Sequence, residues 1–166
     1  LLHEVGERWH QKRLSPAQEH VVSMASRRVV TWLVDAYDTT GEAPVLLVTT
    51  VAGEQHEFGA LMVSVLALEA GWRVAYLGTS LPAEEIVQAA RGTDAAMVAV
   101  SIVNTRDHEG MRSDVTAEMT QVRQGLPVSV PLLLGGAGAL ERRDDLREAG
   151  AVVLTDAAAL SEVLRV

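Results

Sequence analysis

A histidine and a glutamate with the spacing of a metal site carry the clearest chemistry in this chain. They lie in the pattern Glu54-x-His56-x-x-Gly59, directly after the apolar run Val45–Val51. A neutral imidazole is a common metal ligand, and a carboxylate two residues away can hold its second ring nitrogen. An apolar run of this length predicts a buried strand, and open α/β sheets bind ligands at the carboxyl ends of their strands. The pattern therefore predicts a ligand-binding histidine at the edge of a sheet.

The elements that would position this histidine follow from the rest of the pattern. From Val45 onward, short apolar runs alternate with amphipathic stretches, which predicts a five-stranded parallel, doubly wound α/β sheet of the flavodoxin-like (Rossmann-like) kind. The predicted strands are Val45–Val51, Arg73–Leu77, Ala95–Ile102, Pro131–Leu134 and Ala151–Leu154. The predicted helices are about Glu57–Ala70, Ala83–Ala90, Gly110–Gln124, Leu140–Ala149 and Ala157–Leu164.

Residues 1–40 have a different, purely helical pattern. Ser15 is a favourable N-cap, Pro16 suits the first helical position and Gln18 completes a capping box, so a second helix should begin there and run to about Tyr37. We expect two domains, a helical cap at 1–40 and an α/β domain at 45–166, with the cap over the carboxyl edge of the sheet or beside it. The chain begins inside a helical pattern, so we also expect an upstream part.

Small and polar residues follow every predicted strand. Together they would line a slot in which an extended polar group could lie, with glycines that let backbone approach it and hydroxyls that donate hydrogen bonds. These residues are Gly78, Ser80, Ser101, Gly135, Gly136 and Thr155.

Composition and missing motifs exclude several classes of protein. The chain has no cysteine, so disulfides, thiolate zinc sites and iron–sulfur ligation are excluded. Its net charge of −8 makes the chain itself a poor partner for nucleic acid. No stretch is long and apolar enough to cross a membrane, and the cytoplasm is the expected location. The glycines at 135–138 match neither a Walker A loop nor a dinucleotide fingerprint.

The motifs after the first, third and fourth strands resemble those of the cobalamin-binding domain family. That family carries D/E-x-H-x-x-G, then S-x-hydrophobic, then G-G, and here these are Glu54-x-His56-x-x-Gly59, Ser101-x-Val103 and Gly135-Gly136. The resemblance implies that His56 replaces the dimethylbenzimidazole base as lower ligand of cobalt, that Glu54 orients it, and that the freed nucleotide tail enters the slot.

A second cluster lies in the helical region. Trp9 and His10 are followed by Glu19 and His20 at the start of the next helix. An ordinary core tryptophan, a glutamate favourable to the helix dipole and two solvated histidines would also explain this cluster. The spacing resembles that of the CarH-like, MerR-family adenosylcobalamin photoreceptors. The resemblance implies that Trp9, Glu19 and His20 surround the adenosyl group, and that His10 binds cobalt after light has expelled it.

Three functions follow from these patterns. The first is a light-sensing, non-enzymatic adenosylcobalamin module that changes its self-association, as a dimer or tetramer, to control an output domain, with DNA contacted through an upstream domain or an enzyme linked to it. The second is a corrinoid carrier or subunit of a cobalamin-dependent methyltransferase or mutase. The third is a flavodoxin-like interaction domain without a cofactor, which would make both histidine motifs coincidental.

Overall fold

The computed structural model describes residues 16–36, 42–104 and 114–165. The chain forms two compact units, Leu1–Asp38 and Thr39–Val166. The described part of the first unit is helix α2 (Pro16–Ala36), which begins at the predicted proline. None of the described helices has both the length and the apolar character needed to span a membrane.

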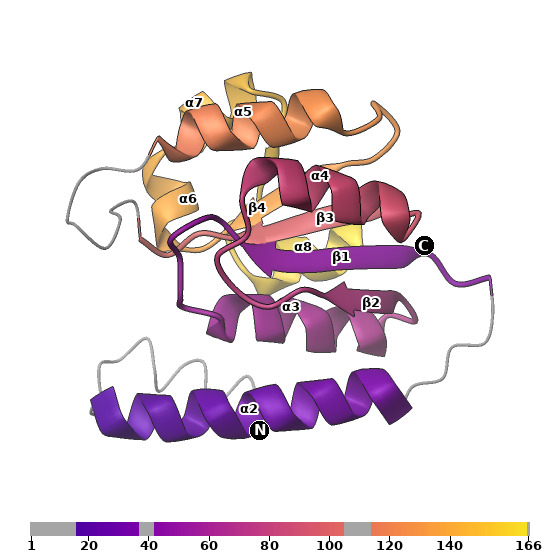
Figure 1. Cartoon of the computed structure of the whole chain (residues 1–166), viewed down its shortest axis with the longest axis vertical. Helices are drawn as coiled ribbons and strands as arrows, with labels where there is room; N and C mark the ends of the chain where they lie inside the picture. Colours follow the sequence, from indigo (N-terminus) through magenta and orange to yellow (C-terminus); the bar gives the residue numbers. More distant parts are fainter. Residues whose placement is uncertain (1–15, 37–41, 105–113, 166) are drawn as a thin grey trace. The chain divides into compact units, whose positions relative to one another are not determined.

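Five parallel strands in the order β2-β1-β3-β4-β5 form the sheet of the second unit (Figure 1). The predicted α/β class and the parallel sheet are therefore confirmed. In chain order the strands are β1 (Val45–Thr50), β2 (Arg73–Tyr76), β3 (Met97–Ser101), β4 (Leu132–Gly135) and β5 (Val152–Val153).

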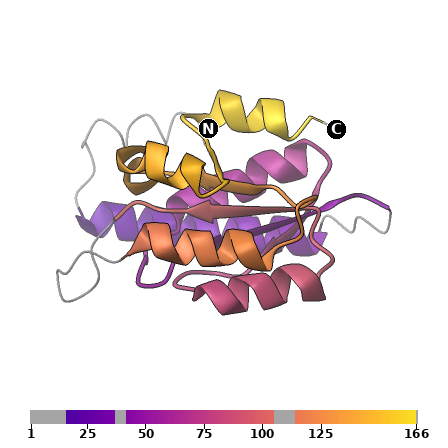
Figure 2. The ribbon, with the colours of Figure 1, turned by 90° about the horizontal axis from the view of Figure 1, so that it is seen from above.

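Helices cover both faces of this sheet (Figure 2). Helices α3 (Phe58–Glu69) and α8 (Ala157–Val163) lie on one face, and α4 (Ala83–Gly92) and α5 (Val115–Gly125) lie on the other. Successive strand residues point to opposite faces, so each strand feeds two separate apolar cores. In β1, for example, Leu47 is buried on the side of α4 and α5, whereas its neighbour Leu46 is buried on the side of α3 and α8.

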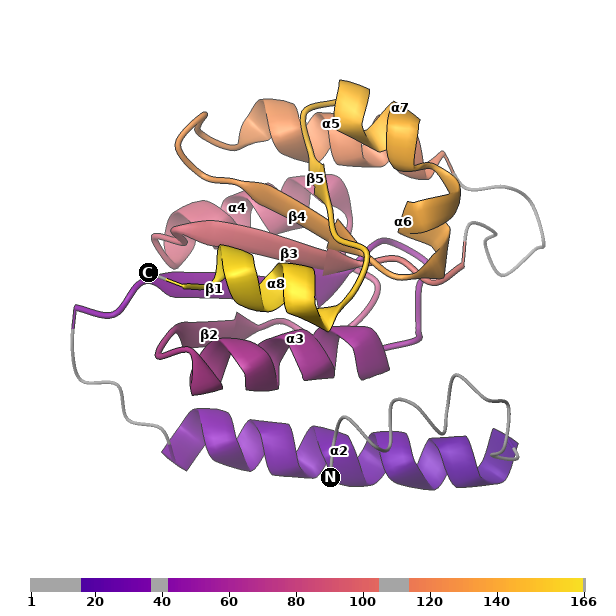
Figure 3. The same cartoon turned by 180° about the vertical axis from the view of Figure 1, so that it is seen from behind.

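The helical segment after β4 differs from the prediction. One helix was expected at Leu140–Ala149, but the structure has two short ones, α6 (Ala137–Glu141) and α7 (Arg143–Glu148), beside the edge of the sheet that carries β4 and β5 (Figure 3). The backbone turns sharply at Gly136, with φ +103°, so that α6 begins at once, and Arg142 interrupts the helix with φ −116° and ψ 22°. The spacing of apolar residues in the sequence does not predict the change of backbone direction at either position.

The strand order places a topological switch point between β1 and β3. After β1 the chain forms β2 on one side of β1 and then β3 on the other side. At the carboxyl ends of β1 and β3, Thr50 pairs with Ser101. Loops diverge at such a point and leave a crevice, which is where doubly wound sheets bind ligands.

Candidate functional site

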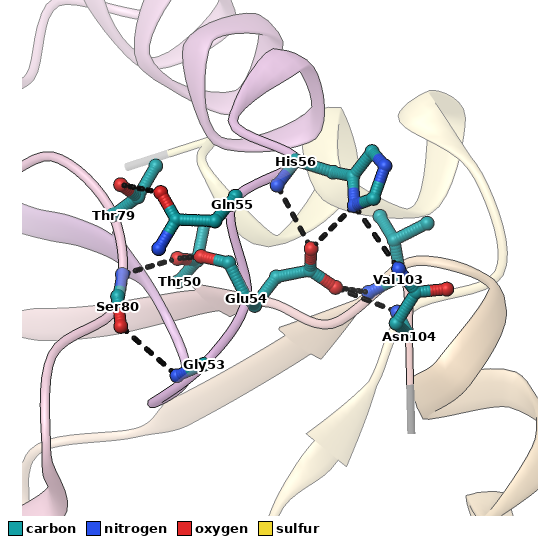
Figure 4. A network of polar contacts seen from close by, with 9 residues as sticks. All are labelled: Thr50, Gly53, Glu54, Gln55, His56, Thr79, Ser80, Val103 and Asn104. Carbon is teal, nitrogen blue, oxygen red and sulfur yellow. Dashed lines mark hydrogen bonds and ion pairs between the residues drawn. The ribbon is translucent and has the colours of Figure 1, made fainter. Parts of the chain in front are cut away.

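The carboxylate of Glu54 joins the loop after β1 to the loop after β3 (Figure 4). Oε1 accepts a hydrogen bond from the backbone N–H of His56 at 2.8 Å and lies 2.6 Å from Nδ1 of the same residue. Oε2 accepts backbone N–H groups of Val103 at 2.9 Å and Asn104 at 2.6 Å. Only 1% of the Glu54 side chain is exposed. Four nitrogen groups therefore hold one buried carboxylate at the switch point.

These contacts keep Glu54 ionised despite its burial. Loss of solvent by itself raises the pKa of a carboxyl group. Hydrogen bonds from the backbone of Asn104 and His56, from the His56 ring and from the backbone of Val103 favour the charged form and outweigh burial. The net effect holds the pKa of Glu54 below its ordinary value. A charged carboxylate here needs an N–H on Nδ1 of the imidazole.

The arrangement leaves the other nitrogen of His56 available to a metal. With Nδ1 turned toward Glu54, Nε2 points away from the network (Figure 4), and none of the described residues donates a hydrogen bond to it or accepts one from it. The side chain is 44% exposed. An imidazole whose Nδ1–H is bound to a carboxylate presents a lone pair on Nε2, which is the form that binds metals.

His56 is the candidate metal ligand at this edge. Among the described residues, no group of three or more His, Cys, Asp or Glu side chains could hold a metal ion, and the chain has no cysteine. The described part of the edge therefore fits a metal that brings other ligands with it, as a metal in a macrocycle does.

A second set of hydrogen bonds fixes the loop that carries Glu54. The hydroxyl of Thr50 donates to the Glu54 carbonyl at 2.7 Å and accepts the Ser80 N–H at 2.8 Å. The Ser80 hydroxyl oxygen accepts the Gly53 N–H at 2.9 Å. Ser80 makes these contacts from a left-handed backbone conformation, with φ +62°, which is uncommon for a residue with a side chain. The loops after β1 and β2 are therefore joined.

Two glycines of the motifs allow backbone elements to approach closely. A Cβ on Gly59 would lie 2.6 Å from the hydroxyl oxygen of Ser101, which is buried against α3. A Cβ on Gly136 would lie 2.3 Å from the carbonyl oxygen of Ile102. At Gly136 the close neighbour is backbone, so glycine is needed there to keep the end of β4 against the end of β3, whereas at Gly59 a side chain would displace the Ser101 hydroxyl.

The structure places all the predicted site residues of the α/β unit at the carboxyl ends of strands, or just beyond them. Those of the first and third loops, Glu54, His56 and Val103, lie in one network. Gly78 contributes its carbonyl oxygen to the Thr49 hydroxyl at 3.1 Å. The others are Gly59, Ser80, Ser101, Gly135, Gly136 and the exposed Thr155.

The predicted residues of the helical region stay predictions. Trp9 and His10 lie outside the described residues. Glu19 and His20 belong to α2, but the description does not extend to their side chains.

Two residues of the network were not predicted from the sequence. They are Thr50, at the end of β1, and Asn104, in the loop after β3. Asn104 places its carboxamide nitrogen 3.2 Å from Nδ1 of His56 and also donates its backbone N–H to Glu54. The signal that could have found both was a polar residue at a carboxyl strand end beside the histidine loop.

Comparison with known proteins agrees with this geometry. Residues 44–164 match the family model of the B12 binding domain. The HTH-type transcriptional repressor CarH of Myxococcus xanthus is 34% identical over 84% of this chain and 45% of its own length. The repressor CarA of the same organism is 30% identical over 91% of this chain and 49% of its own length. The chain thus spans about half the length of these relatives.

Corrinoid proteins match as well. The dimethylamine corrinoid protein 3 of Methanosarcina acetivorans is 33% identical over 55% of this chain and 42% of its own length. The structure of the monomethylamine corrinoid protein of Methanosarcina barkeri superposes with a TM-score of 0.66 at 20% identity, covering 99% of this chain and 77% of that one. The latter likeness concerns the fold.

Proposed function

The chain belongs to the B12-binding domain family, and we propose that it is the cobalamin-binding sensory module of a transcriptional regulator. One observation supports this most directly: at the switch point of the sheet, buried Glu54 holds Nδ1 of His56, and Nε2 of this partly exposed side chain has no hydrogen-bond partner among the described residues. The similarity to the repressors CarH and CarA supports a regulatory rather than an enzymatic role.

The residues present fit a cobalt corrinoid. The corrin ring would supply four nitrogen ligands to cobalt, so one imidazole in place of the benzimidazole would be enough to hold the metal. Among the described residues this edge offers the His56 imidazole and no cluster of ligands. We assign His56 as the lower ligand and Glu54 as its orienting partner. The nucleotide tail would lie along the carboxyl ends of β3 and β4, near Ser101 and Gly135, with Ser80 and Thr155 at neighbouring strand ends.

The finer proposal is a light sensor that uses adenosylcobalamin. When bound, this cofactor supplies a cobalt–carbon bond that light can break. Trp9, Glu19 and His20 would contact the adenosyl group, and His10 would occupy the vacated side of the cobalt. The support is the spacing of these residues together with the relationship to CarH. The output would be a change in self-association, passed to a DNA-binding part of a longer protein.

The test is the absorption spectrum of the chain loaded with adenosylcobalamin in the dark and after illumination. We expect a dark spectrum in which histidine has replaced the benzimidazole, and an irreversible change in light. His56→Ala should lose the histidine-ligated form, whereas Gln55→Ala, an exposed neighbour, should keep it. His10→Ala should alter only the illuminated state. An unchanged lower ligand in His56→Ala would refute the assignment, and a light response no different from that of free cofactor would refute the sensor.

The similarity to dimethylamine corrinoid proteins supports one alternative, a methyl-carrying corrinoid subunit of a methyltransferase. Such a protein would also bind cobalamin through His56. It would accept a methyl group from a methylated donor in the presence of its partner enzyme, and its oligomeric state would not respond to light. Size-exclusion chromatography in the dark and after illumination therefore separates the two functions.

A further inference from the structure

Asn104 contacts both the candidate ligand His56 and its partner Glu54. It follows β3, is exposed, and places its carboxamide 3.2 Å from Nδ1 of His56. Its backbone N–H donates to Oε2 of Glu54 at 2.6 Å. One residue therefore contacts both members of the Glu54–His56 pair, by two separate groups.

The two contacts at Nδ1 require a consistent set of donors and acceptors. Nδ1 carries either one proton or one lone pair, and the bond to Glu54 at 2.6 Å uses the proton. The oxygen and nitrogen of a carboxamide are assigned from the hydrogen-bond network and can exchange places. The consistent orientation turns the Asn104 oxygen to the ring, so that two acceptors share the Nδ1–H. Both then favour the same tautomer, with the lone pair on Nε2.

The second contact also limits how the ring can turn. The His56 side chain is 44% exposed, so protein atoms cover only part of the ring. A single hydrogen bond to Glu54 leaves the ring free to pivot about that bond, and a second contact from another direction restrains this motion. Groups that hydrogen-bond to a metal-binding imidazole commonly tune its affinity for the metal.

We propose that Asn104 is a positioning residue for His56: its carboxamide, together with Glu54, fixes the orientation and tautomer of the imidazole that faces the metal. This inference rests on the proposed role of His56 as lower ligand. Removing the carboxamide should lower the equilibrium constant for histidine ligation of cobalt roughly three- to tenfold, the usual net effect of one hydrogen bond.

The test uses the full chain and three variants. Asn104→Leu keeps the approximate size of the side chain and removes both polar groups. Asn104→Asp keeps only acceptors. Gln55→Leu is the matched control, because Gln55 is exposed and contacts Thr79 at 3.4 Å, away from the ring (Figure 4). All three variants retain the backbone N–H that Asn104 donates to Glu54.

Two measurements decide the outcome. Nitrogen-15 NMR of the cofactor-free protein gives the tautomer of the His56 ring, and absorption spectra with methylcobalamin give the fraction ligated by histidine. In Asn104→Leu we expect a smaller population with the proton on Nδ1 and the three- to tenfold loss of ligation, at an unchanged urea midpoint. Asn104→Asp should keep the Nδ1–H tautomer, and Gln55→Leu should match the parent chain.

Other results would overturn the inference. Parent-like values for Asn104→Leu in both measurements would show that the carboxamide does not position the ring. A parent chain whose Nδ1 carries no proton would show that the Asn104 carboxamide donates to the ring, and would overturn the assigned orientation. If the parent chain itself never shows a histidine-ligated spectrum, the proposed function fails, and the NMR measurement still decides the effect of Asn104 on the ring.

Discussion

Two glutamates near the carboxyl edge of the sheet have pKa values shifted in opposite directions. Hydrogen bonds to Glu54 outweigh its burial and lower its pKa. For Glu118, on α5, burial raises the pKa and outweighs weaker opposing effects of the nearby backbone N–H groups of Ala52 and Ala83. The difference arises because the donors around Glu54 are more numerous.

The raised pKa of Glu118 predicts a pH-dependent effect of Glu118→Gln on the stability of the protein without cofactor. A carboxyl whose pKa is higher in the folded state contributes most to stability when protonated, and this contribution is lost as the pH rises through the folded pKa. Glutamine keeps a carbonyl acceptor and has no such dependence. We therefore expect the variant to gain stability relative to the parent chain between pH 4 and pH 7.

Urea unfolding at intervals across this range measures the difference. The control is Glu84→Gln, because Glu84 is an exposed residue in the first turn of α4. A stability difference between Glu118→Gln and the parent chain that stays constant, or moves toward the parent as the pH rises, would contradict the assigned shift.

At the scale of elements, the contact between the ends of β3 and β4 depends on Gly136. Its φ is +103°, and the N–H of Gly138, two residues later, donates to the Ile102 carbonyl oxygen at 3.0 Å. The same carbonyl oxygen would lie 2.3 Å from a Cβ at position 136. A side chain would therefore have to push β4 and α6 away from β3.

Gly136→Ala is accordingly expected to destabilise the α/β unit by about 3 kcal/mol, combining backbone strain with overpacking. The matched substitution is Gly92→Ala at the end of α4, where no atom lies within 4 Å of the new Cβ. Alanine favours helix, so this variant should lose nothing and can gain up to about 1 kcal/mol. Chemical denaturation of both variants measures the contrast, and equal midpoints would refute the close approach at Gly136.

For the whole molecule, the described parts of the two units differ in how much apolar core each has to stabilise it as a separate fragment. Both apolar cores consist of residues between Val45 and Leu164. Helix α2 instead exposes large apolar side chains, among them Val21, Met24 and Trp32. Most helical stability in proteins comes from packing of an apolar face, so the described part of the first unit has less to stabilise it on its own.

We therefore expect a chain limited to residues 39–166 to fold with the urea midpoint of the α/β unit in the full chain. It should keep histidine ligation through His56 and lose the light-dependent change that we attribute to Trp9 and His10. Far-UV circular dichroism, denaturation and cobalamin spectra test the three parts. A shortened chain that is unfolded would show that the sheet needs the helical region, and an intact light response would show that the helical cluster is not the sensor.

The α/β class, the five strands and the position of Glu54 and His56 after the first of them could be predicted without a structure. These features follow from local patterns, because strand and helix periodicity and the order of loops are written in neighbouring residues. The match to the family model over residues 44–164 agrees with that interpretation.

The hydrogen bonds that hold the site could not be predicted in this way. The bonds from Val103 and Asn104 to Glu54 join residues 49 and 50 positions apart, and the bond from Gly53 to Ser80 spans 27. Such contacts depend on where the backbone N–H groups of separate loops converge. The pattern of side-chain types along the sequence does not predict that position. The break between α6 and α7 has the same origin, because backbone angles at Gly136 and Arg142, rather than apolar spacing, set it.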